Sequence, residues 1–212
     1  MTSIEEEYVT KVYKNISEHF ADTRFCIWNF VKNFLDTKKP NMRGIDIGCG
    51  NGKNMCYNRC LKIDGFDNCD NFVGICKEKG LSVRPGNCLC LPCQPNSYDY
   101  AMAIAVYHHM ASDEHRKTAI TEMIRTLKRG GKGIFSVWSV ENQKGEKISR
   151  NFVPGDNYVK WMRKRDSKIF QRYYYVYTEE MIVSLMNNFT DLVRDVNIFN
   201  ERGNWIVEFT KV

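Results

Sequence analysis

Long apolar runs are missing from this 212-residue chain: none approaches the roughly 20 residues that a membrane-spanning helix needs. The first seven residues are acidic rather than apolar, so the apolar core of a secretory signal is missing as well. We therefore expect no membrane association and a cytoplasmic location, with the nucleus as the alternative.

A disulfide framework is not expected either, although the chain has nine cysteines. Their number is odd, they are scattered, and a chain of this length does not need covalent staples. No third cysteine follows Cys56 and Cys60 at the spacing of a radical iron–sulfur motif. The run 88–93 contains three cysteines but has no second pair at zinc-ligand spacing. We predict free thiols in a reducing compartment and no metal site in this chain.

The composition is that of one globular domain spanning residues 1–212. Hydrophobic residues make up 43% of the chain, and the sequence contains no internal repeat and no sign of a second core. Residues 1–40 are predicted to form a helical N-terminal extension. Tyr8, Val12, Ile16 and Phe20 recur there every four residues, and a capping box over residues 3–6 would begin the first helix.

Strand and helix patterns alternate after this extension. Apolar segments predict strands at 44–47, 63–66, 81–84, 100–106 and 133–138, with helices at 52–60, 71–79 and 113–127 between them. A helix at 179–187 and two strands at 193–199 and 205–210 follow. This order is typical of an α/β fold with a doubly wound, mostly parallel, Rossmann-like sheet, here with an antiparallel C-terminal hairpin.

A glycine-rich turn follows the first predicted strand of this sheet. The stretch 45–53 contains Asp46, Gly48, Cys49, Gly50 and Gly52. Glycines let the backbone approach a ligand closely, and Asp67, about 20 residues later, stands where such folds hold a ribose. Because the spacing is not G-x-G-x-x-G and no Walker sequence follows, we predict a single nucleoside rather than a pyrophosphate cofactor. A turn used only for packing is the alternative.

The ends of the later strands supply further candidates, because ligands of parallel sheets bind at the carboxyl ends of the strands. These candidates are Asn68, Asn87, Cys88 and Ala105. The fourth predicted strand runs directly into His108 and His109. A single histidine is usually structural, but a histidine pair beside a ligand pocket favours a functional role.

Basic charge is concentrated in one segment, which we interpret as an insertion at 141–177. The net charge of the chain is +6, and this segment has nine basic and four acidic residues, a balance of +5. Aromatic residues alternate with the basic ones. Basic charge attracts phosphates and aromatic faces stack unpaired bases, so the segment predicts either an RNA-binding insertion or a solvated charged one.

The pattern D-x-G-x-G-x-G resembles the first motif of the S-adenosylmethionine-dependent methyltransferases. Over essentially its full length, the chain resembles one of their families, the tRNA wobble-uridine carboxymethyl methyltransferases. The resemblance rests on the glycine stretch 45–53 and, more specifically, on Thr23-Arg24, His108-His109 and Arg172-Tyr173-Tyr174.

This resemblance implies an activity: methyl esterification of 5-carboxymethyluridine at the tRNA wobble position, with S-adenosylmethionine as methyl donor. A carboxylate acceptor has a pKa of about 4 and needs no general base. Arg24 would clamp the carboxylate or a phosphate, and His108 would donate a hydrogen bond that orients the acceptor. His109 would brace the loop. Trp138, Arg172 and Tyr173 would shape the nucleotide pocket.

The resemblance also implies how the cofactor is held. Asp46 would lie near its amino-acid end, and Gly48, Gly50 and Gly52 would form the floor. Asp67 would hold both ribose hydroxyls. Asn87 and Cys88 would lie at the edge of the adenine.

Two partners follow from the resemblance: the tRNA anticodon stem-loop, and a small zinc-binding activator subunit that forms a heterodimer. The edge strand at 81–84 would dock the activator, and the zinc would belong to that partner. Tyr107, Tyr175 and Asn87 depart from the family pattern. Asn87 stands where an aspartate is expected, but an amide oxygen can also accept a bond from the adenine amino group.

Two other functions remain open from the sequence. A small-molecule O- or N-methyltransferase of the same fold would explain the glycine turn and Asp67, but not the basic insertion. A non-catalytic, methyltransferase-like RNA-binding subunit would need a broken cofactor site, and the glycines and Asp67 are intact.

Overall fold

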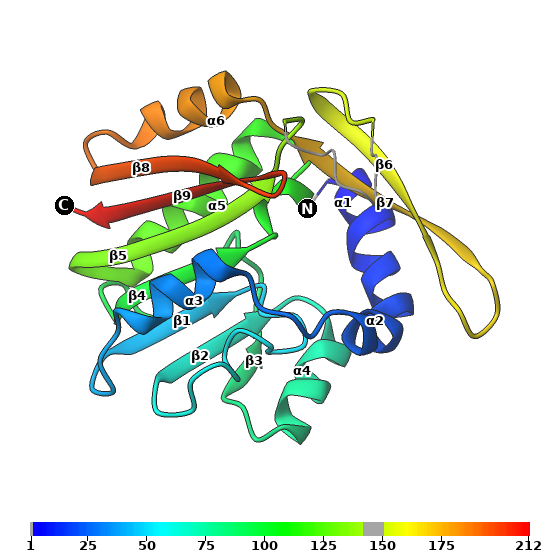
Figure 1. Cartoon of the computed structure of the whole chain (residues 1–212), viewed down its shortest axis with the longest axis horizontal. Coiled ribbons are helices and arrows are strands. Elements are labelled where there is room, and N and C mark those ends of the chain that lie inside the picture. The colour runs from blue at the N-terminus through cyan, green and yellow to red at the C-terminus, as the bar shows by residue number, and fades with distance from the viewer. Residues whose placement is uncertain (1, 142–150) are drawn as a thin grey trace.

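The parallel strands of the main sheet lie side by side with their carboxyl ends on one side of the molecule (Figure 1). The computed structural model describes residues 2–141 and 151–212, so residues 142–150 of the predicted insertion lie outside the described residues. The sheet consists of β1 (Arg43–Ile47), β2 (Lys62–Asp67), β3 (Val83–Pro85), β4 (Tyr98–Ile104), β5 (Leu127–Trp138), β8 (Val193–Glu201) and β9 (Asn204–Lys211).

The order of these strands confirms the predicted topology. They pair as β3-β2-β1-β4-β5-β9-β8, parallel from β3 to β5 and antiparallel from β5 to β8. The last two strands form the predicted C-terminal hairpin. The strand order reverses at β1 and β4, and a ligand crevice is expected at their carboxyl ends.

Helices cover both faces of the sheet, as a doubly wound fold requires. One face packs against α3 (Asn29–Asp36) and α4 (Asp70–Glu78), and the other against α5 (Asp113–Thr126) and α6 (Glu179–Met186). Alternate residues of β4 serve the two faces. Tyr100 and Met102 belong to the α3–α4 core, whereas Ala101 and Ala103 belong to the α5–α6 core. Both faces of the central strands are therefore apolar, which explains why their sequence reads as continuous hydrophobic runs.

The N-terminal extension lies across the carboxyl ends of the strands. It comprises α1 (Ser3–Glu5), η1 (Glu6–Thr10) and α2 (Lys11–Thr23). The capping box uses Thr2 and Glu5, one residue earlier than predicted. Glu5 is buried, and its carboxylate also accepts bonds from the Ala111 N–H and the His115 ring. These bonds attach the start of the extension to the loop that precedes α5 and to the first turn of α5.

The predicted insertion forms an antiparallel hairpin of β6 (Gly155–Met162) and β7 (Ile169–Val176). The hairpin stands beside α2 at the right of Figure 1. Trp161 of β6 packs with Val12 and Ile16 of α2 in a small core of its own. The hairpin and α2 therefore support each other above the end of the sheet.

The predicted helix at 52–60 is wrong, because this stretch forms successive turns. Gly52 has a φ of +73°, and only the Cys56 N–H makes a helix-type bond to its carbonyl. Asn58 then accepts the N–H of Cys60 with its side chain, a local bond that competes with helix formation. Two predicted strands are also displaced: the one at 81–84 begins at Val83, and the one at 100–106 ends at Ile104, before Ala105 at a φ of +61°.

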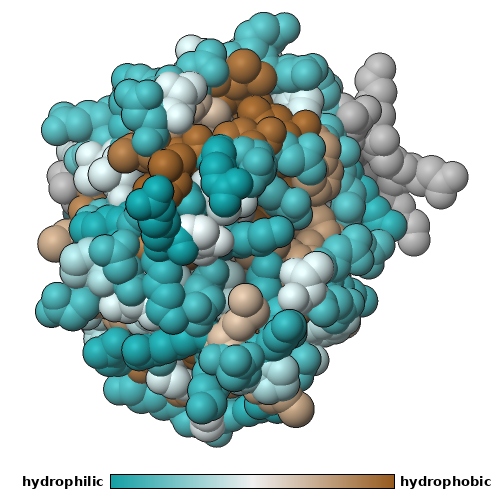
Figure 2. Space-filling model, turned by 90° about the vertical axis from the view of Figure 1, so that its left-hand side faces the viewer, coloured by the Kyte–Doolittle hydropathy of each residue, from teal (hydrophilic) through white to brown (hydrophobic). Residues whose placement is uncertain are grey.

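The face of the molecule away from the strand carboxyl ends is mostly hydrophilic, with one apolar area in its upper part (Figure 2). At the top of the molecule, α6, β8 and the segment between them expose Val183, Val196 and Leu192, respectively. Asp195 has a φ of +53° at an irregularity in the β8–β9 pairing, which interrupts this sheet edge. No helix among residues 2–141 and 151–212 is long and apolar enough to cross a membrane.

Candidate active site

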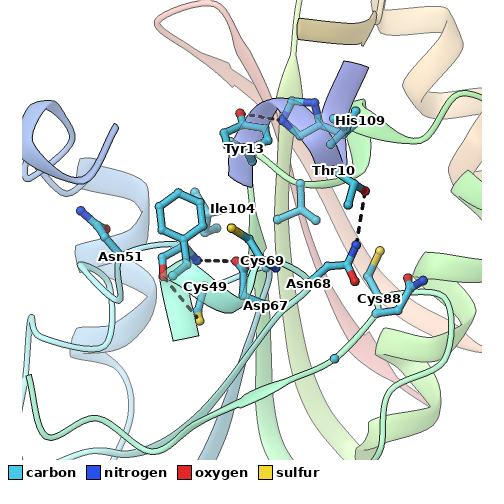
Figure 3. A pocket seen from close by; sticks show the side chains of 18 of the residues that line it. Thr10, Tyr13, Cys49, Asn51, Asp67, Asn68, Cys69, Cys88, Ile104 and His109 are labelled. Carbon is cyan, nitrogen blue, oxygen red and sulfur yellow. Dashed lines mark hydrogen bonds between the residues drawn. The ribbon is translucent and has the colours of Figure 1, made fainter. Parts of the chain in front are cut away.

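A cavity opens at the carboxyl ends of β1, β2 and β4, below α2 (Figure 3). Its wall contains eight of the predicted cofactor residues: Gly48, Cys49, Gly50, Asp67, Asn68, Asn87, Cys88 and Ala105. Prediction from the glycine turn and the strand ends therefore identified most of the lower wall. The other two predicted residues, Asp46 and Gly52, are not among its lining residues, although Gly52 belongs to the same loop and Asp46 precedes it in β1.

Backbone conformation explains the glycines of this wall. Gly48, Gly50 and Gly52 all have φ between +55° and +73°, a region that side chains disfavour. A Cβ on Gly48 would lie 2.6 Å from Val106, and one on Gly52 would lie 2.3 Å from Leu81. A Cβ on Gly50 would meet nothing within 4 Å and would extend into open space. Gly50 thus presents bare backbone to the cavity.

Asp67 is fixed by backbone bonds in the position expected for a ribose partner. One carboxylate oxygen accepts the Gly50 N–H and the other the Cys69 N–H, both at 2.8 Å. Burial raises the pKa of Asp67 to about 6, although these backbone donors oppose the rise. The carboxylate is therefore mainly ionised at neutral pH. Each oxygen keeps a lone pair that can accept a ligand hydroxyl.

Asp46 is a buried carboxylate without a hydrogen-bond partner among the described residues. Burial and the nearby charge of Asp67 raise its pKa to about 8, while Asn54 and Lys53 oppose the rise. A buried acid of this kind is costly to ionise unless a cation arrives. The α-ammonium group of a bound amino acid would be such a cation.

Asn87 and Cys88 form the part of the wall expected at the adenine. The Asn87 side-chain oxygen accepts the Leu89 N–H at 2.9 Å, which leaves one lone pair for a ligand amino group. Burial raises the pKa of the Cys88 thiol to about 12, so this thiol stays protonated. Its predicted role is therefore contact rather than chemistry.

His109 and Tyr13 form the upper part of the cavity, and their side chains are joined in Figure 3. The Nδ1 of His109 lies 2.8 Å from the Tyr173 carbonyl, which can only accept, so Nδ1 carries the hydrogen. The Nε2 then accepts the hydroxyl of Tyr13 at 3.1 Å. Burial lowers the pKa of His109 to about 4, against the Tyr173 bond and with the help of Arg172. The ring is neutral, and its lone pair is occupied.

His108 does not line the cavity, which corrects the expectation that it faces the acceptor. The 3₁₀ turn η2 (Tyr107–His109) directs its ring toward Trp138 and Tyr174, with ring centroids 5.3 and 4.9 Å away. Its Nδ1 accepts the backbone N–H of Trp138 at 3.1 Å, so the hydrogen resides on Nε2. Burial, His109 and Arg172 hold the pKa of His108 well below its usual range.

The remaining predicted substrate residues surround an aromatic cluster beside the cavity rather than its wall. The rings of Trp138 and Tyr174 stack at 3.8 Å, and Arg172 donates to the Tyr174 hydroxyl at 2.6 Å. The side chain of Tyr173 bonds to Asp156 instead of a ligand site, although its carbonyl orients His109. Arg24 is exposed at the end of α2.

Several wall residues were missed because their positions depend on contacts between distant segments. They include Thr10, Tyr13, Asn51, Lys53, Asn54 and Phe72. Asn51 donates to the carbonyls of Ala21 and Arg24, which ties the glycine loop to the end of α2. The helical spacing in α2 predicted a buried stripe, but nothing in that pattern showed that Tyr13 would face a ligand. Among the residues the structure describes, no cluster of three His, Cys, Asp or Glu side chains could hold a metal ion.

Sequence comparison identifies relatives of this chain. Residues 45–135 match the family described as Methyltransferase domain. A tRNA (carboxymethyluridine(34)-5-O)-methyltransferase of Schizosaccharomyces pombe is 32% identical over 221 residues, which cover 96% of this chain and 96% of that protein. Matches to longer relatives with this activity in their names cover 21–57% of those proteins.

Solved structures show the same fold at low sequence identity. A methyltransferase of Thermotoga maritima described as S-adenosylmethionine-dependent has a TM-score of 0.65 and 17% identity, with 95% of this chain and 99% of that one covered. A structure from Haloferax volcanii described as a complex of the Trm112 methyltransferase activator with a methyltransferase has a TM-score of 0.64 and 16% identity. Its match covers 97% of this chain and 98% of that one.

The cavity fits S-adenosylmethionine, the cofactor named for the Thermotoga maritima methyltransferase of the same fold. The unpaired acid of Asp46 suits the ammonium group, Asp67 suits the ribose, and the bare backbone at Gly50 leaves room for close approach.

Replacing Gly50 with alanine should abolish most cofactor binding at a modest cost in stability. The new methyl group would occupy the cavity, and the positive φ costs roughly 1–2 kcal/mol. Gly80→Ala is the matched control, since Gly80 has a φ of +70°, equally open surroundings and no place in the cavity wall. Calorimetry and thermal melting should show similar losses in Tm but weakened binding only for Gly50→Ala. Equal binding by both variants would contradict this account of the wall.

Asp46→Asn should stabilise the free protein while weakening cofactor binding. Because the pKa of Asp46 is raised to about 8, the folded state binds more protons than the unfolded state between about pH 4 and 8. The contribution of Asp46 to the free energy of unfolding therefore falls as pH rises through that window. The Tm of Asp46→Asn should accordingly exceed that of the parent protein by a margin that grows with pH. Conversely, the affinity of the unsubstituted protein for S-adenosylmethionine should rise toward pH 8, because binding ionises Asp46.

Calorimetry at several pH values tests both halves of this prediction. Asp46→Asn should bind S-adenosylmethionine more weakly than the parent protein does, and its affinity should depend less on pH. A variant that binds as tightly as the parent protein would show that Asp46 does not pair with the cofactor.

Proposed function

Because the chain belongs to the tRNA (carboxymethyluridine(34)-5-O)-methyltransferase family, we propose that it esterifies 5-carboxymethyluridine at the tRNA wobble position. The methyl group comes from S-adenosylmethionine, and the product is 5-methoxycarbonylmethyluridine. The observation that carries the proposal is the state of the two histidines. Tyr13 occupies the lone pair of His109, and the Trp138 N–H occupies that of His108. Neither ring is free to take a proton, which suits a carboxylate acceptor.

The chemistry needs orientation more than acid–base catalysis. Bound S-adenosylmethionine supplies an electrophilic methyl group on a sulfonium sulfur. An acceptor carboxylate, with a pKa of about 4, is already ionised at neutral pH. Asp67 and the glycine loop hold the donor side, while His109 and Tyr13 bound the space above it. Holding the two reacting atoms in line can lower the barrier by about 7–11 kcal/mol.

The outer face of the β6–β7 hairpin is the proposed contact for the anticodon region of tRNA. Tyr158, Met162 and Ile169 are exposed there to 47%, 60% and 59%. Exposed basic residues lie on β6 and on the turn: Lys160, Lys164, Arg165 and Lys168. Charge of this sign attracts phosphates, and the exposed ring of Tyr158 can stack on an unpaired base.

The β3 edge of the main sheet is the proposed docking site for a small zinc-binding activator. The support is the Haloferax volcanii methyltransferase, which has this fold and was solved with the Trm112 activator. Within the described part of the chain, β3 pairs only with β2 at this end of the sheet, and Arg84 and Pro85 are exposed. A second chain could add a strand here. We also propose a cytoplasmic location, for which the support is nine free thiols.

Methyl transfer should be measured with labelled S-adenosylmethionine and tRNA carrying 5-carboxymethyluridine, with the activator present. We expect label in an alkali-labile ester at the wobble base. With the cofactor saturating, the single-turnover rate should stay constant between about pH 5.5 and 8, since the depressed pKa values leave both histidines neutral. The same tRNA with unmodified uridine is the control.

Other results would favour the competing functions. Transfer to a small hydroxyl or amine compound, with none to tRNA, would indicate a small-molecule methyltransferase. Cofactor binding without transfer to any acceptor would indicate a non-catalytic subunit. A rate that rises through pH 6.5 would contradict the assigned state of the histidines.

Activator binding at the β3 edge should appear in hydrogen–deuterium exchange. Adding a Trm112-type activator with its zinc should slow exchange of the amides at 81–86 by about tenfold. Amides at 193–201 in β8, at the opposite edge of the sheet, are the internal control and should be unaffected. Protection of β8 alone would place the activator at the opposite edge of the sheet. Protection of neither edge would contradict docking of the activator on this sheet.

A further inference from the structure

Arg172 is a buried cation without a carboxylate partner among the described residues. Its exposed fraction is 4%, its Nε makes no hydrogen bond there, and Nη1 donates to the neutral hydroxyl of Tyr174. Two other buried arginines provide a comparison. Arg163 pairs with Asp166 through two nitrogens, and Arg116 lies 4.0 Å from Asp113 and also bonds to a backbone carbonyl. Arg172 alone among these three relies on aromatic rings and a hydroxyl.

The surroundings of Arg172 lead to the cavity. Its Cζ lies 4.6 Å from the centroid of the Trp161 ring and 5.2 Å from that of Tyr174. The Tyr174 ring lies 4.6 Å from that of His109, which is part of the cavity wall. The guanidinium is therefore one aromatic ring away from the side of the cavity where an acceptor would meet the methyl donor.

The electrostatics of this cluster favour an anion. A buried charge without a counter-ion is costly, and part of that cost is recovered when a carboxylate arrives. His108 and His109 are neutral, so they neither compete for the anion nor supply the charge themselves. A guanidinium group keeps its positive charge and donates charge-assisted hydrogen bonds to a carboxylate oxygen.

We propose that Arg172 recognises the carboxylate of the acceptor nucleotide and so determines the specificity of the site for a carboxymethylated base. This inference rests on the proposed function. Arg172 holds one carboxylate oxygen and leaves the other directed toward the methyl donor. Arg24, expected from the sequence to be the clamp, lies 5.3 Å from the same Trp161 ring but is exposed. In water a single ion pair contributes little, so Arg24 is better suited to a phosphate.

The test is a thermodynamic cycle between the arginine and the carboxylate. Affinity is measured for two anticodon stem-loops, one with 5-carboxymethyluridine and one with uridine, with the activator present and S-adenosylhomocysteine replacing the donor. The parent protein should prefer the carboxylate-bearing RNA by about tenfold or more. In Arg172→Met this ratio should fall to near one, and in Arg172→Lys to an intermediate value.

Two control variants separate this role from charge or packing in general. Arg24→Met should weaken both RNAs equally and keep the ratio, as expected for a phosphate contact. Arg163→Met removes another buried arginine of the hairpin, and this variant should also keep the affinity ratio between the two RNAs. Because Arg172 is outside the cavity wall, unchanged affinity for S-adenosylhomocysteine verifies that its variants are folded. If Arg172→Met does not fold, the affinity ratio of Arg172→Lys decides whether Arg172 recognises the carboxylate.

Three results would overturn the proposal: a ratio unchanged in folded Arg172 variants, a ratio lost in Arg24→Met instead, or no preference in the parent protein. Methyl transfer by the parent protein to the carboxylate-bearing RNA is measured alongside. Transfer combined with an unchanged ratio would refute only the role of Arg172, whereas absence of transfer would refute the proposed function itself.

Discussion

The carboxylate of Asp67 is the interaction on which the site depends. It accepts one N–H from the glycine loop after β1 and another from the start of α4, so a single side chain joins two strand ends. This arrangement holds Gly50 in its left-handed conformation and turns bare backbone toward the ligand. Because the carboxylate is bonded on both oxygens, it faces the ribose position without a flexible side chain having to be ordered on binding.

The cavity and the region beside it differ in the kinds of residues that form them. The donor half is a loop of glycines, acids and backbone amides at the end of a parallel sheet, as in other nucleotide-binding folds. Beside it lies a cluster of rings in contact, Trp138, Tyr174 and the two histidines, contributed by β5, β7 and η2, of which His109 reaches the cavity wall. Tyr174 and both histidines are buried, and the low dielectric of such surroundings strengthens the few charges that remain.

Sequence reasoning succeeded where the signal is local. The positions of Gly48, Gly50 and Asp67 follow from a strand, a turn and the next strand, and each has a backbone conformation or spacing to identify it. It failed where a contact spans the chain. A turn of 3₁₀ helix exchanged the expected positions of His108 and His109. The hairpin was unrecognised because Arg172, Tyr173 and Tyr174 of β7 are buried in succession, so contacts with distant segments replace the alternating pattern of a half-buried strand. The wrong helix at 52–60 shows a third limit, since side-chain bonds of asparagine redirected the backbone there.

The ring of His109 has a mechanical consequence. Its two nitrogens bond to Tyr13 of α2 and to the backbone of β7, so one imidazole fastens the roof of the donor cavity to the hairpin. Neither segment can lift away without breaking a buried bond that water cannot immediately replace. The N-terminal helix and the hairpin are therefore coupled through one side chain, and local opening of either is expected to involve the other.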